Sequence, residues 1–82
     1  MITLKQAVES VRQYVDEFGD IFPSRTTARL EETEFEKNVW KITLSFEDPS
    51  SFASAINMLR RYKVFSVNGT TGEVIAMRDR KP

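Results

Sequence analysis

Apolar residues recur at helical spacing near the start of the chain. Between residues 3 and 18 they fall three or four positions apart, at Leu4, Ala7, Val8, Val11, Val15 and Phe18. This spacing puts them on one side of a helix and leaves the charged residues on the other sides. Thr3 and Gln6 have the spacing of a capping box, in which each side chain accepts a hydrogen bond from the other residue's backbone N–H. The pattern predicts an amphipathic helix over residues 3–18 that packs one face on a flat surface.

The period changes to two further along the chain. From position 40 to position 47, polar residues alternate with four apolar ones, Trp40, Ile42, Leu44 and Phe46. This alternation predicts a strand that is buried on one face. Because Trp40 is in phase with the other three, we interpret it as a core residue, with a binding anchor as the alternative.

A more polar strand is predicted just before it, over residues 28–36. Residues 36–38 form a short turn, and so short a link requires the two strands to be antiparallel. Phe35 is out of phase with Leu30. We therefore expect a bulge, in which one strand carries an extra residue, near Thr33.

A second helix is predicted over residues 49–60. Asp48 is a good N-cap, and Pro49 is a good first residue of a helix. Apolar residues follow at helical spacing, at Phe52, Ala55, Ile56 and Leu59. The serines Ser50 and Ser51 weaken this pattern, and a partly ordered loop is the alternative.

The chain ends with a second predicted hairpin. Two runs rich in β-branched and aromatic residues, 62–67 and 73–80, flank the turn formed by residues 68–72. Val64 and Phe65 are adjacent apolar residues. We therefore expect this hairpin either to be covered on more than one face or to form the central pair of the sheet.

Together these elements predict an α+β fold in a single domain, residues 1–82. An N-terminal helix packs on an antiparallel sheet of about four strands, in the order α-β-β-α-β-β, with the second helix between the hairpins. Eighty-two residues suffice for one compact domain and are too few for two. A chain of this size needs its apolar residues for the core, so we expect binding on an outer surface or a sheet edge.

The composition removes several kinds of chemistry. The chain has no cysteine and no histidine, so disulfides, thiolate catalysis and the commonest general base and metal ligand are absent. Twelve basic and twelve acidic residues give zero formal net charge, which argues against nucleic-acid binding. We expect no catalytic set, no metal, no cofactor and no nucleic-acid partner.

Localisation is inferred from the absence of long apolar segments. No apolar run approaches the ~20 residues of a membrane span, and no basic segment followed by an apolar one marks a secretory signal. We expect a cytoplasmic protein without a membrane partner. A chain from which an export signal had been removed would look the same.

Two features resemble sites but have simpler interpretations. Residues 69–72 are glycine-rich like a phosphate-binding loop, yet such a loop precedes a helix, and here a strand is predicted to follow. The second feature is a row of carboxylates along one predicted strand, Glu31, Glu32, Glu34 and Glu36. Such rows more often provide solubility and discourage edge pairing than act as a hydrolytic pair.

Charge is unevenly distributed along the chain. Residues 26–50 are mainly acidic and residues 51–82 are mainly basic. This polarity can select an oppositely polarised partner, or it can be an ordinary mixed surface. The candidate partner-binding residues are Arg60, Arg61, Lys63, Arg78 and Arg80.

Residues 62–75 resemble the closing segment of PepSY-like domains. In that family a strand leads into a turn similar to Asp-x-x-Thr-Gly-Glu-Val. Residues 71–74 of this chain match that turn directly, and Asn68 stands where the family commonly has aspartate. The resemblance implies a cystatin-like arrangement of a helix on a sheet. It also implies a noncatalytic module, often associated with peptidase inhibition or regulation.

We therefore expect a noncatalytic protein-binding or regulatory module, with peptidase regulation as the form that the resemblance implies. Its partner is a protein, a peptidase in that form, or a second copy of the chain. One alternative is a small homo-oligomeric structural protein whose exposed sheet pairs with itself. A less favoured alternative is an enzyme that uses only carboxylate and arginine side chains.

Overall fold

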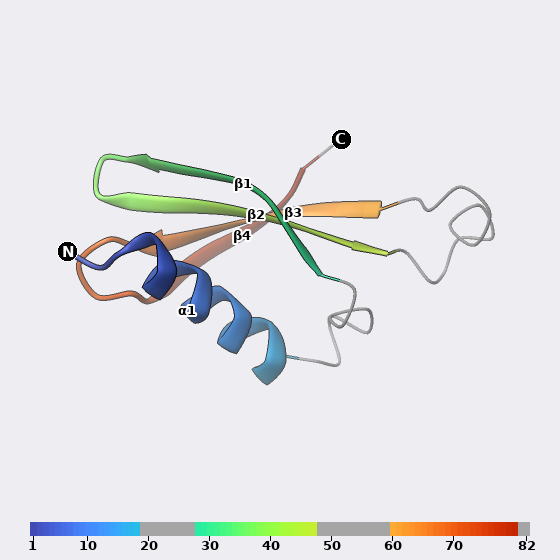
Figure 1. Cartoon of the computed structure of the whole chain (residues 1–82), viewed down its shortest axis with the longest axis horizontal. Coiled ribbons are helices and arrows are strands. Elements are labelled where there is room, and N and C mark those ends of the chain that lie inside the picture. The colour runs from blue at the N-terminus through green and yellow to red at the C-terminus, as the bar shows by residue number, and fades with distance from the viewer. Residues whose placement is uncertain (19–27, 48–59, 81–82) are drawn as a thin grey trace.

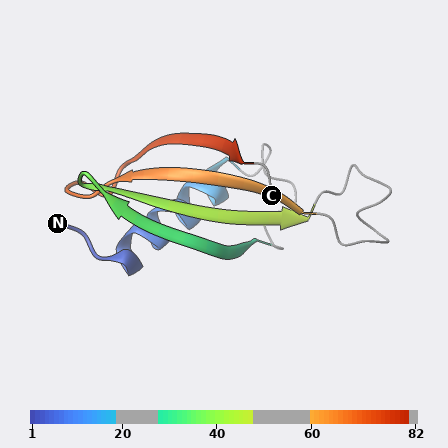
Figure 2. The same cartoon turned by 90° about the horizontal axis from the view of Figure 1, so that it is seen from above.

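The computed structural model describes residues 1–18, 28–47 and 60–80 of the chain. Its elements, in chain order, are helix α1 (Leu4–Glu17) and strands β1 (Arg29–Glu36), β2 (Val39–Glu47), β3 (Arg60–Asn68) and β4 (Val74–Arg80). The strands form one antiparallel sheet in the order β1-β2-β3-β4, and α1 lies across one of its faces (Figure 1, Figure 2). This confirms the α+β class and the packing of a helix on a four-stranded antiparallel sheet.

The predicted second helix, residues 49–60, falls outside the described residues except at its last position. Arg60 is the first residue of β3, and it pairs with Glu47 on β2. The strand therefore begins two residues before the predicted start at Tyr62, because its backbone continues the ladder to the end of β2.

Helix α1 begins as the sequence predicts. The Thr3 hydroxyl accepts a hydrogen bond from the Gln6 backbone N–H at 3.2 Å, and the Gln6 side chain accepts one from the Thr3 backbone N–H at 2.8 Å. The helix buries three residues that lie four positions apart and so project from one side, Ala7, Val11 and Val15. Leu4 and Phe18, which end the predicted apolar stripe, are exposed. The buried contact is therefore shorter than the stripe.

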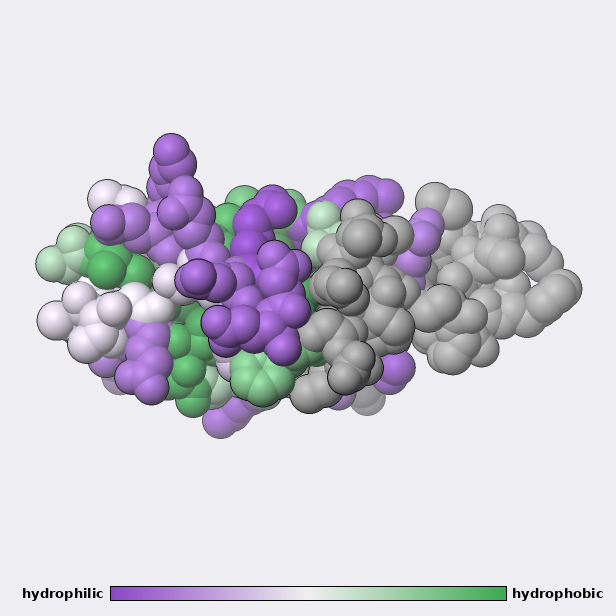
Figure 3. All heavy atoms as spheres, turned by 90° about the horizontal axis from the view of Figure 1, so that it is seen from below, coloured by the Kyte–Doolittle hydropathy of each residue, from purple (hydrophilic) through white to green (hydrophobic). Residues whose placement is uncertain are grey.

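The core lies between α1 and one face of the sheet, called here the covered face. Strands β2 and β3 supply its buried apolar residues, Ile42, Leu44, Phe46, Phe65 and Val67. Trp40 packs against them, with its ring centroid 4.6 Å from that of Phe35 and its indole N–H donating to the Ile2 carbonyl at 3.3 Å. Trp40 therefore lies on the core side of the sheet, partly buried and packed against the buried cluster. Viewed from the helix side, hydrophilic residues cover the outside of α1, and hydrophobic atoms show beside them (Figure 3).

The first hairpin contains the expected bulge, but at a different residue. The β1–β2 register shifts between Leu30 and Glu32, so the extra residue is Glu31 and not Thr33. The bulge changes the phase of β1, which places Phe35 directly opposite Trp40 on the covered face. The Ser45 hydroxyl donates a 2.5 Å hydrogen bond to the Glu31 carboxylate.

The two hairpin turns are held together at one end of the sheet. In the first turn Lys37 and Asn38 have φ of 50° and 61°, the left-handed values that a type I′ turn requires. The Asn38 carbonyl accepts from the Gly69 N–H at 2.8 Å, and the Gly69 carbonyl accepts from the Ile2 N–H at 2.7 Å. A Cβ at position 69 would lie 2.6 Å from the Asn38 side chain. Only glycine allows this approach.

The second turn is built around Asn68. Its side-chain oxygen accepts from the backbone N–H groups of Thr70 at 2.8 Å and Thr71 at 3.0 Å, as in an Asx turn. Gly72 follows with φ of 78° and donates its N–H to the Asn68 carbonyl. A strand follows the turn. The interpretation of this glycine-rich segment as a hairpin turn is confirmed.

The second hairpin is not the central pair of the sheet. Strand β3 is central, but β4 forms an edge. Val64 projects to the face opposite α1, where it is half-buried, and Ile75 on β4 is exposed. Among the described residues, no helix covers that second face, so the adjacent apolar residues do not reflect helices on both sides.

Candidate binding face

The second face of the sheet, called here the open face, carries opposite charges at its two edges. Residues that pair directly in antiparallel strands share a face. One row across the sheet consists of Glu32, Thr43, Val64 and Arg78, and the next consists of Glu34, Lys41, Ser66 and Ala76. The carboxylates are on β1 and the guanidinium is on β4. Most of the residues between them are small or uncharged.

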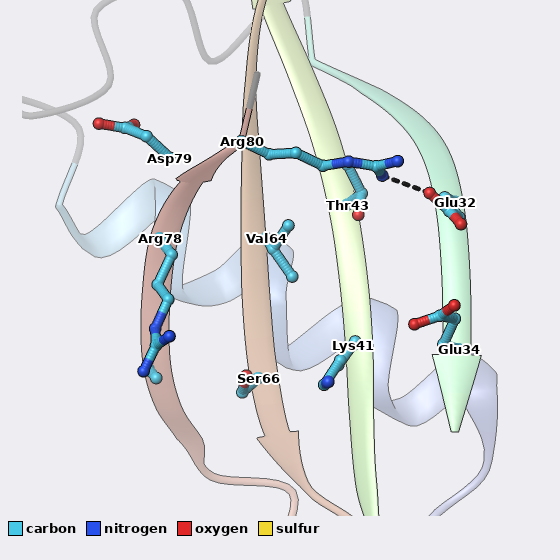
Figure 4. A pocket seen from close by; sticks show the side chains of 10 residues that line it. Glu32, Glu34, Lys41, Thr43, Val64, Ser66, Arg78, Asp79 and Arg80 are labelled. Carbon is cyan, nitrogen blue, oxygen red and sulfur yellow. Dashed lines mark hydrogen bonds and ion pairs between the residues drawn. The ribbon is translucent and has the colours of Figure 1, made fainter. Parts of the chain in front are cut away.

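A hollow of about 490 Å³ lies along this face and is lined by residues of all four strands. Figure 4 shows Glu32 and Glu34 on β1 at one side of the hollow and Arg78 on β4 at the other, with the Arg80 side chain crossing between them. The floor between them includes Thr43, Val64, Ser66 and Ala76. One sheet supplies all the lining residues, and no described element covers the hollow, which suits contact with another macromolecule better than enclosure of a small substrate.

An ion pair between Arg80 and Glu32 crosses the hollow. The Arg80 side chain extends over β3 and β2 to reach Glu32 on β1 (Figure 4). Three strand spacings separate β4 from β1, about 14 Å in a flat sheet. Both side chains must therefore extend along the face. The Arg80 side chain passes beside Thr43 (Figure 4), which is only 3 % exposed on a face that no described helix covers.

The crossing ion pair is easily displaced. Its two side chains are 47 % and 45 % exposed, and exposed pairs contribute about 0–1 kcal/mol. Three further charged side chains on this face, Glu34, Lys41 and Arg78, form no ion pair with any described residue. The open face therefore presents both signs of charge, available to another molecule at little cost in stability.

The basic residues singled out from the sequence fall into two groups. Arg78 and Arg80 lie together on the open face and line the hollow, and Arg60, which pairs with Glu47, is on the same face but does not line it. Arg61 and Lys63 pair with Phe46 and Leu44 and so lie on the covered side of the sheet. Register alone divides the set, because successive residues of a strand point to opposite faces.

Besides Arg80, which pairs with Glu32, two other members of that set have partners within the chain. Arg60 donates from Nε to the Ser45 hydroxyl and from Nη2 to the Ser45 carbonyl, each at 2.8 Å. Lys63 forms an ion pair with Asp79. The hydrogen bond that the Lys63 ammonium donates to Asp79, together with the positive charge of Lys63, lowers the pKa of the Asp79 carboxyl below its ordinary value. Neither Arg60 nor Lys63 lines the hollow, so Arg78 and Arg80 are the members of that set that belong to the candidate face.

Three residues of the face were not predicted from the sequence. Glu32 and Glu34 were interpreted as solubilising charges, and Lys41 as the polar side of a strand. The signal that could have found them is the alternation of β2, which puts Lys41 and Thr43 on the face opposite Ile42. That signal becomes useful only once the neighbouring strands are known.

Comparisons with models of protein families, with curated proteins and with solved structures found no match for this chain. Across residues 1–18, 28–47 and 60–80, no helix is long and apolar enough to cross a membrane. Over the same ranges, no cluster of three or more acidic side chains is arranged to hold a metal ion.

Proposed function

We propose that this chain is a noncatalytic protein-binding or regulatory module that meets a protein partner on the open face of its sheet. The observation that carries the proposal is the placement of opposite charges on the strands that edge the hollow, Glu32 and Glu34 on β1 and Arg78 and Arg80 on β4. Charge arranged in this way orients an approaching protein and rejects partners of the wrong polarity.

The form of the face supports binding rather than catalysis. The acidic residues of β1 are exposed along an edge strand, whereas a hydrolytic carboxylate pair is fixed in a cleft. The sequence also lacks the histidine and cysteine that most often serve as base and nucleophile. An enzyme that uses only carboxylates and arginines remains the less favoured candidate.

The specific form that we propose is regulation of a peptidase. It is supported by the resemblance of residues 62–75 to PepSY-like domains and by the helix-on-sheet arrangement, which agrees with what that resemblance implies. In this form the edge strand β4 and the open face beside it meet the peptidase.

The test is the association rate of a partner captured from the native host. Reversing the charge of Arg78 and Arg80 together to glutamate should slow association more than it speeds dissociation, because exposed charges act mainly on the encounter. Added salt should weaken binding of the wild-type chain and affect the double variant less. Surface plasmon resonance at low and high salt measures both rates.

A matched control reverses two exposed basic residues on the outside of α1, Lys5 and Arg12. This control changes the net charge equally but leaves the open face intact, so its association rate should stay near that of the wild type. Equal association rates for wild type and the Arg78/Arg80 variant at low salt would remove the electrostatic part of the proposal. Turnover of a substrate, lost on one carboxylate substitution, would contradict the noncatalytic assignment.

A further inference from the structure

One row of the open face has opposite charges at its two ends, so a reversed copy of the row is complementary to it. Glu32, Thr43, Val64 and Arg78 follow one another across the four strands, each paired with the next in the ladder. An acid stands at one edge, a base stands at the other, and two small side chains lie between them. A second copy of the row, turned around, therefore matches the first.

Symmetry limits how two such faces can meet. In a two-fold interface, if one residue contacts a second residue of the other copy, the reverse contact occurs as well. An axis across the strands would stack β1 on β1 and β4 on β4, opposing like charges. An axis parallel to the strands, passing between β2 and β3, stacks β1 of each copy on β4 of the other. Only this second axis opposes Glu32 to Arg78.

We propose that a second copy of this chain occupies the open face, with the two sheets face to face about a two-fold axis parallel to the strands. Glu32 of each copy then faces Arg78 of the other, and Thr43 faces Val64. The inference rests on the proposed function in one respect, that the open face is a binding surface, and it names an occupant of that face.

The geometry of stacked sheets fits these contacts. Facing sheets pack about 10 Å apart, a gap that an extended arginine and a glutamate can bridge together. The floor residues are small enough to approach at the centre, where β2 lies over β3. In the neighbouring row of Arg29, Ser45, Tyr62 and Arg80, the same axis brings Arg29 near Arg80 of the other copy, so these two long side chains have to extend apart. The hollow of about 490 Å³ leaves room for Lys41 and Arg80 of each copy. The ion pair between Arg80 and Glu32 has to open, and its exposure makes that inexpensive.

The size of the face indicates a weak dimer. Four strands spaced about 4.8 Å apart and about eight residues long cover roughly 500 Å² per copy, or about 1,000 Å² in total. Specific interfaces of this size are at the lower limit for stable association. We expect a dissociation constant on the order of 0.1 mM. Another protein that binds the open face must then displace the second copy.

The test is sedimentation equilibrium of the full chain over a concentration series that reaches the millimolar range. Wild type should pass from monomer to dimer. Glu32→Arg and Arg78→Glu should each raise the dissociation constant by about tenfold or more, because each change opposes like charges twice. The variant with both changes should dimerise like wild type, since the charges are exchanged and remain complementary. An equimolar mixture of the two single variants should also dimerise.

Matched controls change the same charges elsewhere. Glu9→Arg and Arg12→Glu alter exposed residues on the outside of α1 and should leave the dissociation constant unchanged. Circular dichroism checks that each variant is folded. If a reversal unfolds the chain, Glu32→Gln and Arg78→Gln test the same contact with a smaller loss of affinity, about threefold.

A chain that stays monomeric at millimolar concentration would overturn the inference. A dimer that responds neither to Glu32 nor to Arg78 would overturn it too, because that result places the contact at a strand edge or on the helix. The proposed function fails separately. A host partner that binds a monomeric chain through Arg78 refutes only the second copy as occupant. A charge-sensitive dimer whose host partner binds the Arg78/Arg80 variant normally refutes only the partner-binding role of the face.

Discussion

The two faces of the sheet are made by the same strands, yet they bury their residues in different ways. On the covered face, Ile42 is fully buried under the valines of α1. On the open face, Thr43 and Ser45 are 3 % and 0 % exposed, although no described helix lies over them. Polar side chains contact Ser45 instead, since Arg60 and Glu31 both form hydrogen bonds with its hydroxyl. Burial alone therefore does not mark the core.

The difference separates what stabilises the molecule from what it presents to others. Apolar area removed from water contributes about 25 cal/mol per Å², whereas exposed ion pairs contribute little. The covered face should therefore hold most of the folding free energy. The open face can change its contacts with little effect on the fold, as a binding surface requires.

The largest expected effect comes from placing a charge under the helix. Val11 is fully buried between α1 and the sheet. Val11→Asp should lower the free energy of unfolding by about 3 kcal/mol or more, because an unpaired carboxylate would enter the core. Urea denaturation measures this loss. Arg12→Asp, on the exposed side of the same helix, should change stability by less than about 0.5 kcal/mol. Equal losses would show that the covered face is not the core.

Two valines of β3 compare the faces more directly. Val67 is fully buried on the covered face, and Val64 is half-buried on the open face. Val67→Ala should cost about 2 kcal/mol, from two lost carbons and the cavity they leave. Val64→Ala should cost less than about 1 kcal/mol. A loss for Val64 as large as that for Val67 would mean that the open face also holds a core.

The turn at the end of the sheet belongs to neither face. Backbone conformation should therefore decide how much a substitution at Gly72 lowers the free energy of unfolding. Gly72 has φ of 78°, and a Cβ there would meet nothing closer than 3.5 Å. Gly72→Ala should therefore cost about 1 kcal/mol through the left-handed backbone alone. Gly72→Asn should cost less, because asparagine tolerates this region. If alanine stabilises the chain and asparagine does not, conformational strain is the wrong explanation.

The sequence predicted what local pattern controls and missed what strand pairing controls. The capping box of α1 and the glycine turn follow from residues close together in the chain. The bulge was expected from the phase of Phe35, but its position at Glu31 depends on where Ser45 and Leu44 lie in the neighbouring strand. Thr43 likewise lies beside the crossing side chain of Arg80, which is distant in sequence (Figure 4).

The candidate face shows the same limit. Sequence reasoning grouped Arg60, Arg61, Lys63, Arg78 and Arg80 by charge. Register puts Arg61 and Lys63 on the other face, and Arg60 binds Ser45. The structure brings Arg78 and Arg80 together with Glu32 and Glu34 instead. Acidic and basic residues on distant strands become neighbours only when the order β1-β2-β3-β4 is known, and no spacing within one strand reveals that order.

The smallest expected effect concerns Asp79, on the exposed rim of the sheet. Lys63 donates a hydrogen bond to its carboxylate and adds a favourable charge, which together lower the pKa of Asp79. A carboxyl with a lowered pKa in the folded state adds stability above its unfolded pKa, about 3.9 for aspartate. That stability is lost as the pH falls through the folded value. The side chain is 73 % exposed, so the gain at neutral pH should be small.

Comparison of wild type with Asp79→Asn isolates this contribution from the other carboxylates. In urea denaturation at low salt, wild type should be slightly more stable at neutral pH. The difference should shrink below about pH 4 and vanish once Asp79 is protonated, because the neutral acid no longer attracts Lys63. Added salt should reduce the difference at neutral pH, as expected for an exposed pair. A difference that persists unchanged into acid would show that Asp79 acts through packing. The packed region of the covered face would then include the Asp79 side chain on β4, which its exposure and its ion pair with Lys63 place outside that region.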